Sequence, residues 1–171
     1  MFDFFKSCVL SQFEAALWML NDCITRCSEQ HWSGPNSIIG TYEFWHVAYH
    51  TLYCTDGDLS RDEKSVEFPT QFYPGGKSDV EDEYPSRMMT QRELLDFAQH
   101  CLAKLRSAMA AETAESFVGH CGFARKKLSR AELHIYNMRH VMHHTGQLSA
   151  LLRRVGLKED HQPRWGHAGW A

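Results

Sequence analysis

Apolar residues recur at every third or fourth position in four segments of the chain, a spacing typical of helices with one buried face. The first segment covers residues 5–27 and the second residues 38–59. The third runs from about residue 90 to 111, and the fourth from about 129 until Gly156 ends it. Little of the remaining sequence resembles a strand. The pattern therefore predicts an all-α fold with four long helices.

Local signals fix where these helices begin. Thr90 with Glu93, and Ser129 with Glu132, form two capping boxes, in which each side chain can satisfy a backbone amide at the helix start. The second segment follows the break Gly34-Pro-Asn-Ser37, which offers a cap, so we expect its helix to begin at Ile38.

The stretch 60–89 is rich in Pro, Gly and charged residues, which predicts a long connection. Loops of this length often border a functional site. Two helices, one long connection and two further helices suit an antiparallel or crossover four-helix bundle. We expect the tail with Trp165 and Trp170 to be irregular.

The length and composition indicate one domain that spans residues 1–171, because 171 residues with 43% hydrophobic content can bury one core. The net charge of -3 argues against nucleic acid as a partner. The densest basic group contains Arg125, Lys126, Lys127 and Arg130, and we interpret it as a solvated loop that leads into a helix.

Targeting signals are not evident. The first residues lack the basic and apolar regions of a signal peptide, and no stretch approaches the ~20 apolar residues of a membrane span. Six scattered cysteines without CxxC pairs suggest reduced and mostly buried thiols. We therefore expect a cytoplasmic protein that does not contact membranes.

Histidines in the fourth segment are the residues most suggestive of chemistry. His140 and His144 are four positions apart, so both imidazoles lie on one helical face and can reach a single cation, whereas His143 points away. Neighbouring apolar residues predict that the pair faces the interior. The spacing alone fits a metal site and a pair of hydrogen-bonded buried histidines equally well.

A third ligand can come from the second segment, where His46 and His50 are also one turn apart. Three imidazoles leave coordination positions open and suit a catalytic site, whereas structural zinc sites usually have four ligands. Cys54 follows His50 by four residues and offers a fourth ligand, although a free cysteine is the interpretation that we favour.

The two histidine segments, Trp-x-Val-Ala-Tyr-His-Thr-Leu and Arg-His-x-x-His-His-x-Gly-Gln-Leu, resemble those of the DinB-like family, which includes the YfiT-like proteins. The resemblance extends over nearly the whole chain. It implies a four-helix bundle that binds one divalent metal ion, nickel or zinc, on one histidine of the second helix and two of the fourth. These are His140, His144 and, from the longer matching motif, His50; a shorter alignment selects His46.

The resemblance also implies a function. Characterised members include transferases that add a low-molecular-weight thiol, such as bacillithiol or mycothiol, to a small electrophilic substrate, and the resemblance also suggests that this chain forms a homodimer. Two other classes stay open, a non-catalytic bundle stabilised by its metal or binding a protein partner, and a metal-dependent hydrolase. No catalytic residue is identified from the sequence.

Five nearby residues have secondary candidate roles. Asp56 or Asp58 would support a metal ligand, although we consider exposed acids at a helix end the more common case. Tyr49, Tyr53 and Gln147 would line the pocket, with core packing or amide hydrogen bonding as the alternative.

Overall fold

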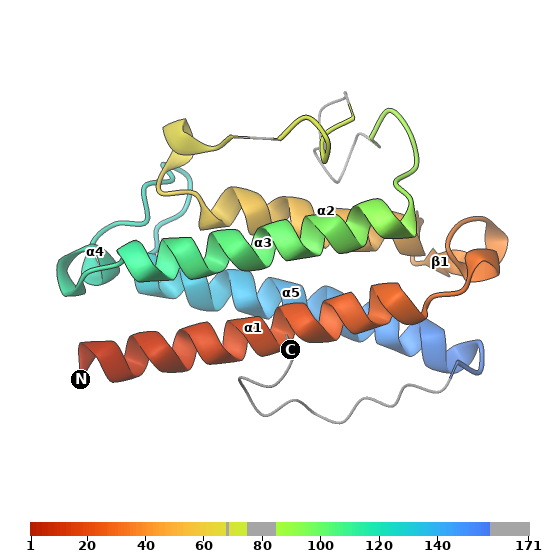
Figure 1. Ribbon diagram of the computed structural model, residues 1–171, viewed down its shortest axis with the longest axis horizontal. Helices are drawn as coiled ribbons and strands as arrows, with labels where there is room; N and C mark the ends of the chain where they lie inside the picture. Colours follow the sequence, from red (N-terminus) through yellow and green to blue (C-terminus); the bar gives the residue numbers. More distant parts are fainter. Residues whose placement is uncertain (68, 75–84, 158–171) are drawn as a thin grey trace.

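Four long helices dominate the computed structural model, which describes residues 1–67, 69–74 and 85–157 (Figure 1). They are α1 (Phe2–Arg26), α2 (Phe44–Leu59), α3 (Gln91–Ala111) and α5 (Arg130–Arg154). The shorter elements are η1 (Glu29–His31), η2 (Pro35–Ser37), β1 (Ile38–Ile39), β2 (Tyr42–Glu43), η3 (Glu63–Ser65) and α4 (Ala114–Val118). The predicted all-α class is confirmed. The expected irregular tail with Trp165 and Trp170 lies outside the described residues.

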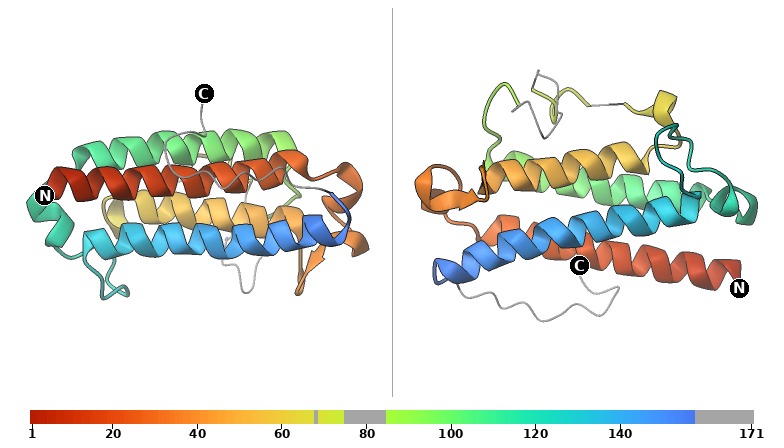
Figure 2. Two further views of the ribbon diagram at one scale, coloured as in Figure 1. Left: turned by 90° about the horizontal axis from the view of Figure 1, so that it is seen from below. Right: turned by 180° about the vertical axis from the view of Figure 1, so that it is seen from behind.

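The four long helices pack side by side as a bundle. α1 and α2 each contact both α3 and α5, so α1 and α2 lie mainly on opposite corners (Figures 1 and 2). α2 and α3 run in the same direction, and α1 and α5 run in the opposite direction. Because parallel neighbours need a connection that returns along the bundle, the long segment between α2 and α3 makes this a crossover bundle.

The core fills the space between the four helices. Aromatic side chains contribute much of it, and Phe13, Phe44 and Phe97 are fully buried. Burying each such side chain stabilises the fold by about 1.5–3 kcal/mol. Phe72, from the crossover, stacks on Phe97 with ring centroids 4.5 Å apart, so part of the crossover belongs to the core.

The start of α2 differs from the prediction. The helix begins at Phe44 and not at Ile38, because residues 38–43 form the antiparallel β1–β2 hairpin. Gly40 is the first residue of its two-residue turn and has φ +65°, a left-handed conformation that favours glycine. The apolar residues of segment 38–43 are spaced as they would be in a helix, but the turn at Gly40 reverses the direction of the chain.

Both predicted capping boxes are present, at Thr90 with Glu93 and at Ser129 with Glu132. A third, formed by Thr113 and Ser116, begins α4, which the sequence analysis did not predict. The short α4 lies in the connection from α3 to α5 at one end of the bundle (Figure 1).

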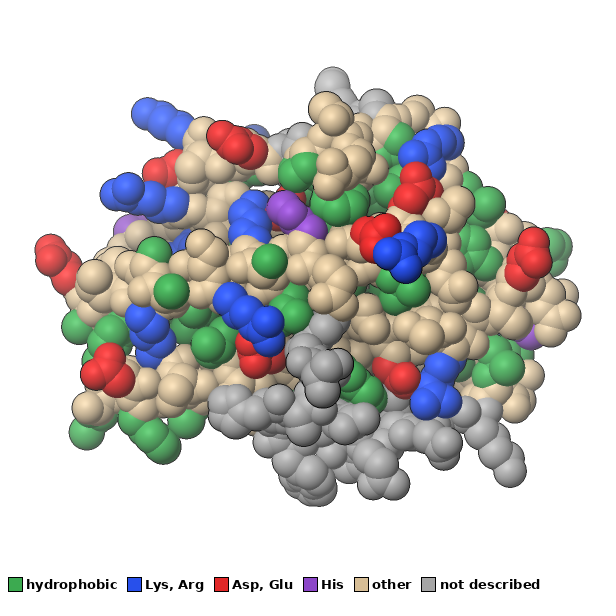
Figure 3. Space-filling view, viewed as in Figure 1, with side chains coloured by type: hydrophobic (Ala, Val, Ile, Leu, Met, Phe, Trp, Pro, Cys, Tyr) green, Lys and Arg blue, Asp and Glu red, His purple; other side chains and the backbone are tan. Residues whose placement is uncertain are grey.

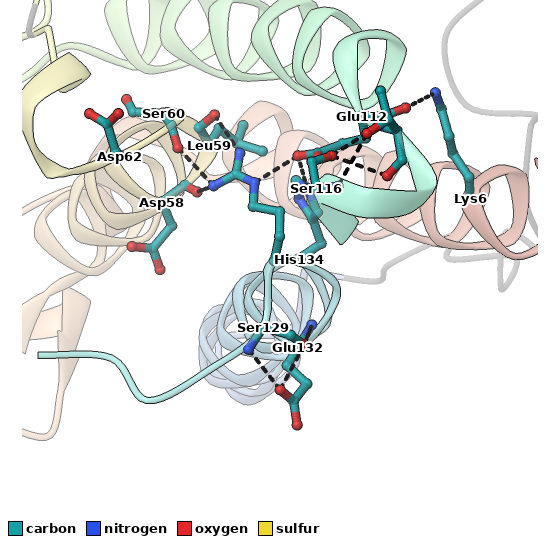
Figure 4. A network of polar contacts seen from close by, with 12 residues as sticks. Lys6, Asp58, Leu59, Ser60, Asp62, Glu112, Ser116, Ser129, Glu132 and His134 are labelled. Carbon is teal, nitrogen blue, oxygen red and sulfur yellow. Dashed lines mark hydrogen bonds and ion pairs between the residues drawn. The ribbon is translucent and has the colours of Figure 1, made fainter. Parts of the chain in front are cut away.

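Arg130 departs from the predicted solvated basic loop. Its side chain is buried, donates from Nε to Glu112 Oε1 at 2.7 Å, and donates from its terminal nitrogens to Leu59 and Ser60 carbonyls. Glu112 also accepts hydrogen bonds from His134 Nε2 at 3.0 Å and from Ser116 (Figure 4). This buried network joins the end of α2 to α3, α4 and α5.

Charges of both signs are mixed on the face shown in Figure 3, and neither sign forms a continuous patch there. Hydrophobic side chains gather over the start of α1, where Phe4 is 73% exposed.

All six cysteines are free thiols, four of them buried, while Cys8 is exposed and Cys54 half-buried. No helix in the described ranges combines the length and apolar character that a membrane span needs.

Candidate metal centre

Three histidines from two helices meet at the boundary between α2 and α5. The helices are antiparallel neighbours, and the Asn137 side-chain amide donates to the Thr55 carbonyl at 3.1 Å across the boundary. This register places His50 opposite His140 and His144, which follow each other by one turn on α5. The structure thus brings together the three residues that the sequence analysis selected.

The three side chains converge through their ring nitrogens. Nε2 of His140 lies 3.1 Å from Nε2 of His50 and 3.1 Å from Nε2 of His144. One nitrogen from each residue lies within 4.8 Å of the other two. Three nitrogens about 2.1 Å from one tetrahedral ion would be about 3.4 Å apart, so the group fits a single ion after small adjustments.

Neighbouring side chains orient two of the three imidazoles. His144 Nδ1 is 2.8 Å from the Gln147 amide oxygen, which can only accept, so Nδ1 carries the proton and Nε2 presents its lone pair to the group. Cys54 Sγ lies 3.5 Å from His50 Nδ1. His140 Nδ1 is buried and has no hydrogen-bond partner among the described residues.

The surroundings keep these histidines uncharged. Burial, with smaller contributions from the nearby His144 and His140, lowers the pKa of His50 to about 3. Burial and the neighbouring His144 lower the pKa of His140 to about 4. Burial also lowers the pKa of His144, although Gln147 opposes this effect. Neutral imidazole is the form that binds metal ions, so the group is prepared to bind near pH 7.

His46 and His143 are not part of the group. His46 is buried one turn before His50, where its ring packs against those of Tyr42 and Trp45 at centroid distances of 4.9 and 5.4 Å. His143 is exposed on α5, as its position in the sequence predicts. The geometry therefore favours His50 over His46 as the ligand from α2.

Two pockets adjoin the three histidines along the α2–α5 boundary. The hairpin pocket, of about 330 Å³, is lined by Ile39, Gly40, Thr41, Tyr42, His46, Val47, His50, His144 and Gln147. The loop pocket, of about 280 Å³, is lined by Tyr53, Cys54, Gly57, Asp58, Glu63, Val66, Phe123, Lys126, Tyr136 and His140. Because α2 and α5 are antiparallel, these lining residues place the histidines between the two pockets.

The two acidic candidates are not the exposed acids that we considered more common at a helix end. Asp56 is fully buried and contacts Lys104 Nζ at 2.7 Å, Tyr73 Oη at 2.8 Å and His100 Nε2 at 3.1 Å. Those partners belong to α3 and the crossover, so Asp56 joins three segments and supports none of the three site histidines. Asp58 is nearly buried and forms an ion pair with Lys126.

The remaining candidates divide between the pockets and the core. Tyr49 is buried and packs against Phe97, as the packing alternative predicts. Tyr53 lines the loop pocket, and Gln147 both lines the hairpin pocket and binds His144. Cys54 is a free thiol beside His50, and its sulfur is not part of the three-residue group. Lys126 and Glu63 also line the loop pocket, although Lys126 was expected in a solvated basic loop and no motif marks Glu63.

Comparison with known proteins supports the resemblance seen in the sequence. The model of the DinB family matches residues 44–162, a range that includes all three site histidines. No curated protein and no solved structure gives a significant match. Since the family model covers more than half of the chain, the chain belongs to the DinB family.

Proposed function

We propose that the protein is a metal-dependent enzyme that holds one divalent ion on His50, His140 and His144 and transfers a low-molecular-weight thiol to a small electrophile. The convergence of three neutral imidazoles beside two pockets is the observation that supports it. Three protein ligands leave room at the ion for a substrate, as in catalytic zinc sites. Imidazole ligands suit both zinc and nickel, which are the proposed metals.

The bound ion would lower the pKa of a thiol or of water, and so provide a nucleophile near neutral pH. The chain's own residues would hold the ion, fix the direction of His144 through Gln147, and receive the two reactants in the adjoining pockets. In the overall reaction, the thiol proton passes to solvent, the sulfur forms a bond to the electrophile, and the bond to the leaving group breaks so that this group departs with its electron pair.

A metal-dependent hydrolase is the less favoured alternative, and it would use water as the nucleophile with a nearby carboxylate as the general base. Of the two carboxylates that line the loop pocket, Asp58 already pairs with Lys126. Glu63 also lines that pocket, so the hydrolase stays an alternative to the proposed thiol transfer.

Elemental analysis tests the metal centre. The parent protein, prepared without a metal-binding tag, should contain about one equivalent of nickel or zinc, and His50→Ala, His140→Ala and His144→Ala should each lose it. His46→Ala and His143→Ala are matched controls that should retain the metal. A parent protein that stays free of metal after reconstitution would overturn the proposal.

A second assay separates the enzyme from a structural metal protein. The metal-loaded parent is mixed with a panel of small thiols and a chromogenic electrophile, and formation of the thioether is followed. The expected result is turnover that disappears with His144→Ala. If the protein binds the metal stably but forms a thioether with none of the thiols, the ion has a structural role.

A further inference from the structure

The two pockets beside the histidines differ in their chemistry. The hairpin pocket has no Asp, Glu, Lys or Arg among the described residues that line it. The loop pocket has two carboxylates, from Asp58 and Glu63, and the ammonium group of Lys126. It also has three aromatic rings, from Tyr53, Phe123 and Tyr136.

The Lys126 ammonium group occupies a cage of aromatic rings and a carboxylate inside the loop pocket. Its Nζ lies 5.1 Å from the ring centroid of Tyr136 and 5.5 Å from that of Phe123, and it donates to the Asp58 carboxylate. Aromatic faces attract cations at these distances. The pocket is therefore built from groups that bind an ammonium ion, and an ammonium ion of the chain itself is bound there.

A close backbone contact holds this loop in place. Gly122 has φ +86°, and a side chain there would approach Asp62 Cβ to 2.7 Å and the Arg61 carbonyl to 2.8 Å. The Gly122 carbonyl accepts a hydrogen bond from the backbone amide of Glu63 at 3.2 Å. The contact fixes the loop that carries Phe123 and Lys126 against the segment that carries Glu63.

We propose that the loop pocket is a second subsite, which binds the ammonium group of an amine-bearing small molecule, and that Lys126 occupies this cage until the ligand displaces it. Two carboxylates and one ammonium group give the described lining a net charge of -1, which favours a cation over an anion. Because His140 lines the same pocket, the other end of the molecule reaches the three histidines. We therefore assign the amine to the thiol substrate. Only this assignment, and not the ammonium subsite itself, rests on the proposed function.

Displacement of Lys126 requires little rearrangement. Its side chain is 31% exposed, so the ammonium group can turn into water, where it regains full hydration. Asp58 is only 11% exposed, and burial raises the pKa of its carboxyl group against the opposing effect of Lys126. The ionised form of this carboxyl group therefore depends on a cationic partner, and a bound ammonium group would take that role when Lys126 leaves.

Binding of simple probes to the metal-free protein tests the ammonium site. Butylammonium, butanol and butyrate have the same four-carbon chain and differ in charge, and their binding can be followed by chemical-shift titration in the parent and in Lys126→Met. Loss of the internal competitor should strengthen butylammonium binding by about tenfold, with little change for butanol. Shifts should appear at Tyr136 and Phe123.

Control variants make the result specific. Lys127→Met removes the neighbouring exposed lysine, which does not line the pocket, and should leave butylammonium binding unchanged. Tyr136→Leu combined with Lys126→Met should cancel most of the gain. If Lys126→Met does not fold, Lys126→Gln makes the same test. Equal binding of butylammonium and butyrate, or no gain in either Lys126 variant, would overturn the ammonium subsite, whether or not the protein binds a metal.

Discussion

At the residue scale, Gln147 is the side chain that holds the His144 imidazole in one direction. Gln147→Leu removes the acceptor for Nδ1, so the ring gains freedom and the affinity for the metal should fall by about 10- to 100-fold. Gln147→Glu keeps an acceptor and should retain most of the affinity. Competition with a chelating dye measures both values.

The control for this prediction is Met142→Leu, an exposed position on α5 that is not part of the histidine group. Its metal affinity should match that of the parent. A Gln147→Leu protein with parental affinity would show that His144 needs no fixed orientation to bind the ion.

The three histidines should also make the metal-free protein sensitive to acid. Burial and the neighbouring site histidines lower the folded pKa of His50 to about 3 and that of His140 to about 4, against 6.5 for an ordinary histidine. Below pH 6.5 the unfolded chain therefore binds protons that the folded chain excludes, and the free energy of unfolding decreases as the pH falls towards 4. Urea denaturation at several pH values measures this loss.

A double variant, His50→Gln with His140→Gln, should have a shallower decrease between pH 6.5 and 4.5. Glu112 does not interfere in this range. Its burial is outweighed by hydrogen bonds from His134, Ser116 and Arg130, which bring its pKa to about 2, so its contribution is lost only as the pH falls below 4.5. If the free energy of unfolding falls equally steeply with pH in the parent and in the double variant, His50 and His140 do not cause the acid sensitivity.

The choice between His46 and His50 shows what helical spacing leaves open. Both residues lie on neighbouring turns of α2, and periodicity alone does not distinguish them. Which of the two lies opposite the histidines of α5 depends on the register between α2 and α5. That register is set by packing between residues that are 90 positions apart in the sequence. The longer matching motif selected His50, and the observed geometry agrees.

At the scale of elements, Asp56 connects α2, α3 and the crossover through Lys104, His100 and Tyr73. Asp56→Asn would leave the Lys104 ammonium without its buried partner and should lower the free energy of unfolding by about 3 kcal/mol. Chemical denaturation measures this effect. The metal content of the folded variant should not change, because Asp56 contacts none of the three site histidines.

Asp96→Asn is the matched control, since Asp96 also pairs with a basic residue, Arg92, but at an exposed position on α3. The loss should stay below about 1 kcal/mol. An Asp56→Asn protein that is fully stable but free of metal would instead place Asp56 in support of the metal site.

Element boundaries were predictable where a side chain marks them. Thr90 and Ser129 cap α3 and α5 as their capping boxes indicate. The start of α2 was missed because the apolar residues of the β1–β2 hairpin are spaced as in a helix, while Gly40 carries the signal for the turn. The burial of Asp56 and Arg130 could not be predicted, because it depends on partners supplied by other helices.

At the scale of the whole molecule, the proposed ion would crosslink α2 and α5. A ligand that binds only the folded state stabilises it by about 2.7 kcal/mol at a free concentration 100 times its dissociation constant. For a chain of this size, removal of the metal should lower the melting temperature by roughly 5 to 10 °C. Thermal denaturation with and without a chelator measures the difference.

His144→Ala should melt at the same temperature with and without the chelator. The parent protein should recover its higher melting temperature when zinc or nickel is returned. A parent whose melting temperature is independent of metal would mean that α2 and α5 reach their full stability without an ion between them.

The bundle architecture could be predicted from the sequence, because four amphipathic segments and one long connection restrict the possible arrangements. The sequence left antiparallel and crossover bundles as alternatives. The shared direction of α2 and α3, and the packing of α1 against α3 far more than against α2, decide for the crossover form. No local pattern encodes that pairing.

The 90 positions between His50 and His140 have a consequence for how the ion would be acquired. A ribosome adds about 5–20 residues per second, so His50 waits roughly 5 to 20 s before the other two ligands are made. During that time it offers one imidazole, which does not retain an ion by itself. Metal uptake would therefore follow synthesis of α5, and the cell's free metal pool at that moment, together with the finished bundle's geometry, would select the ion.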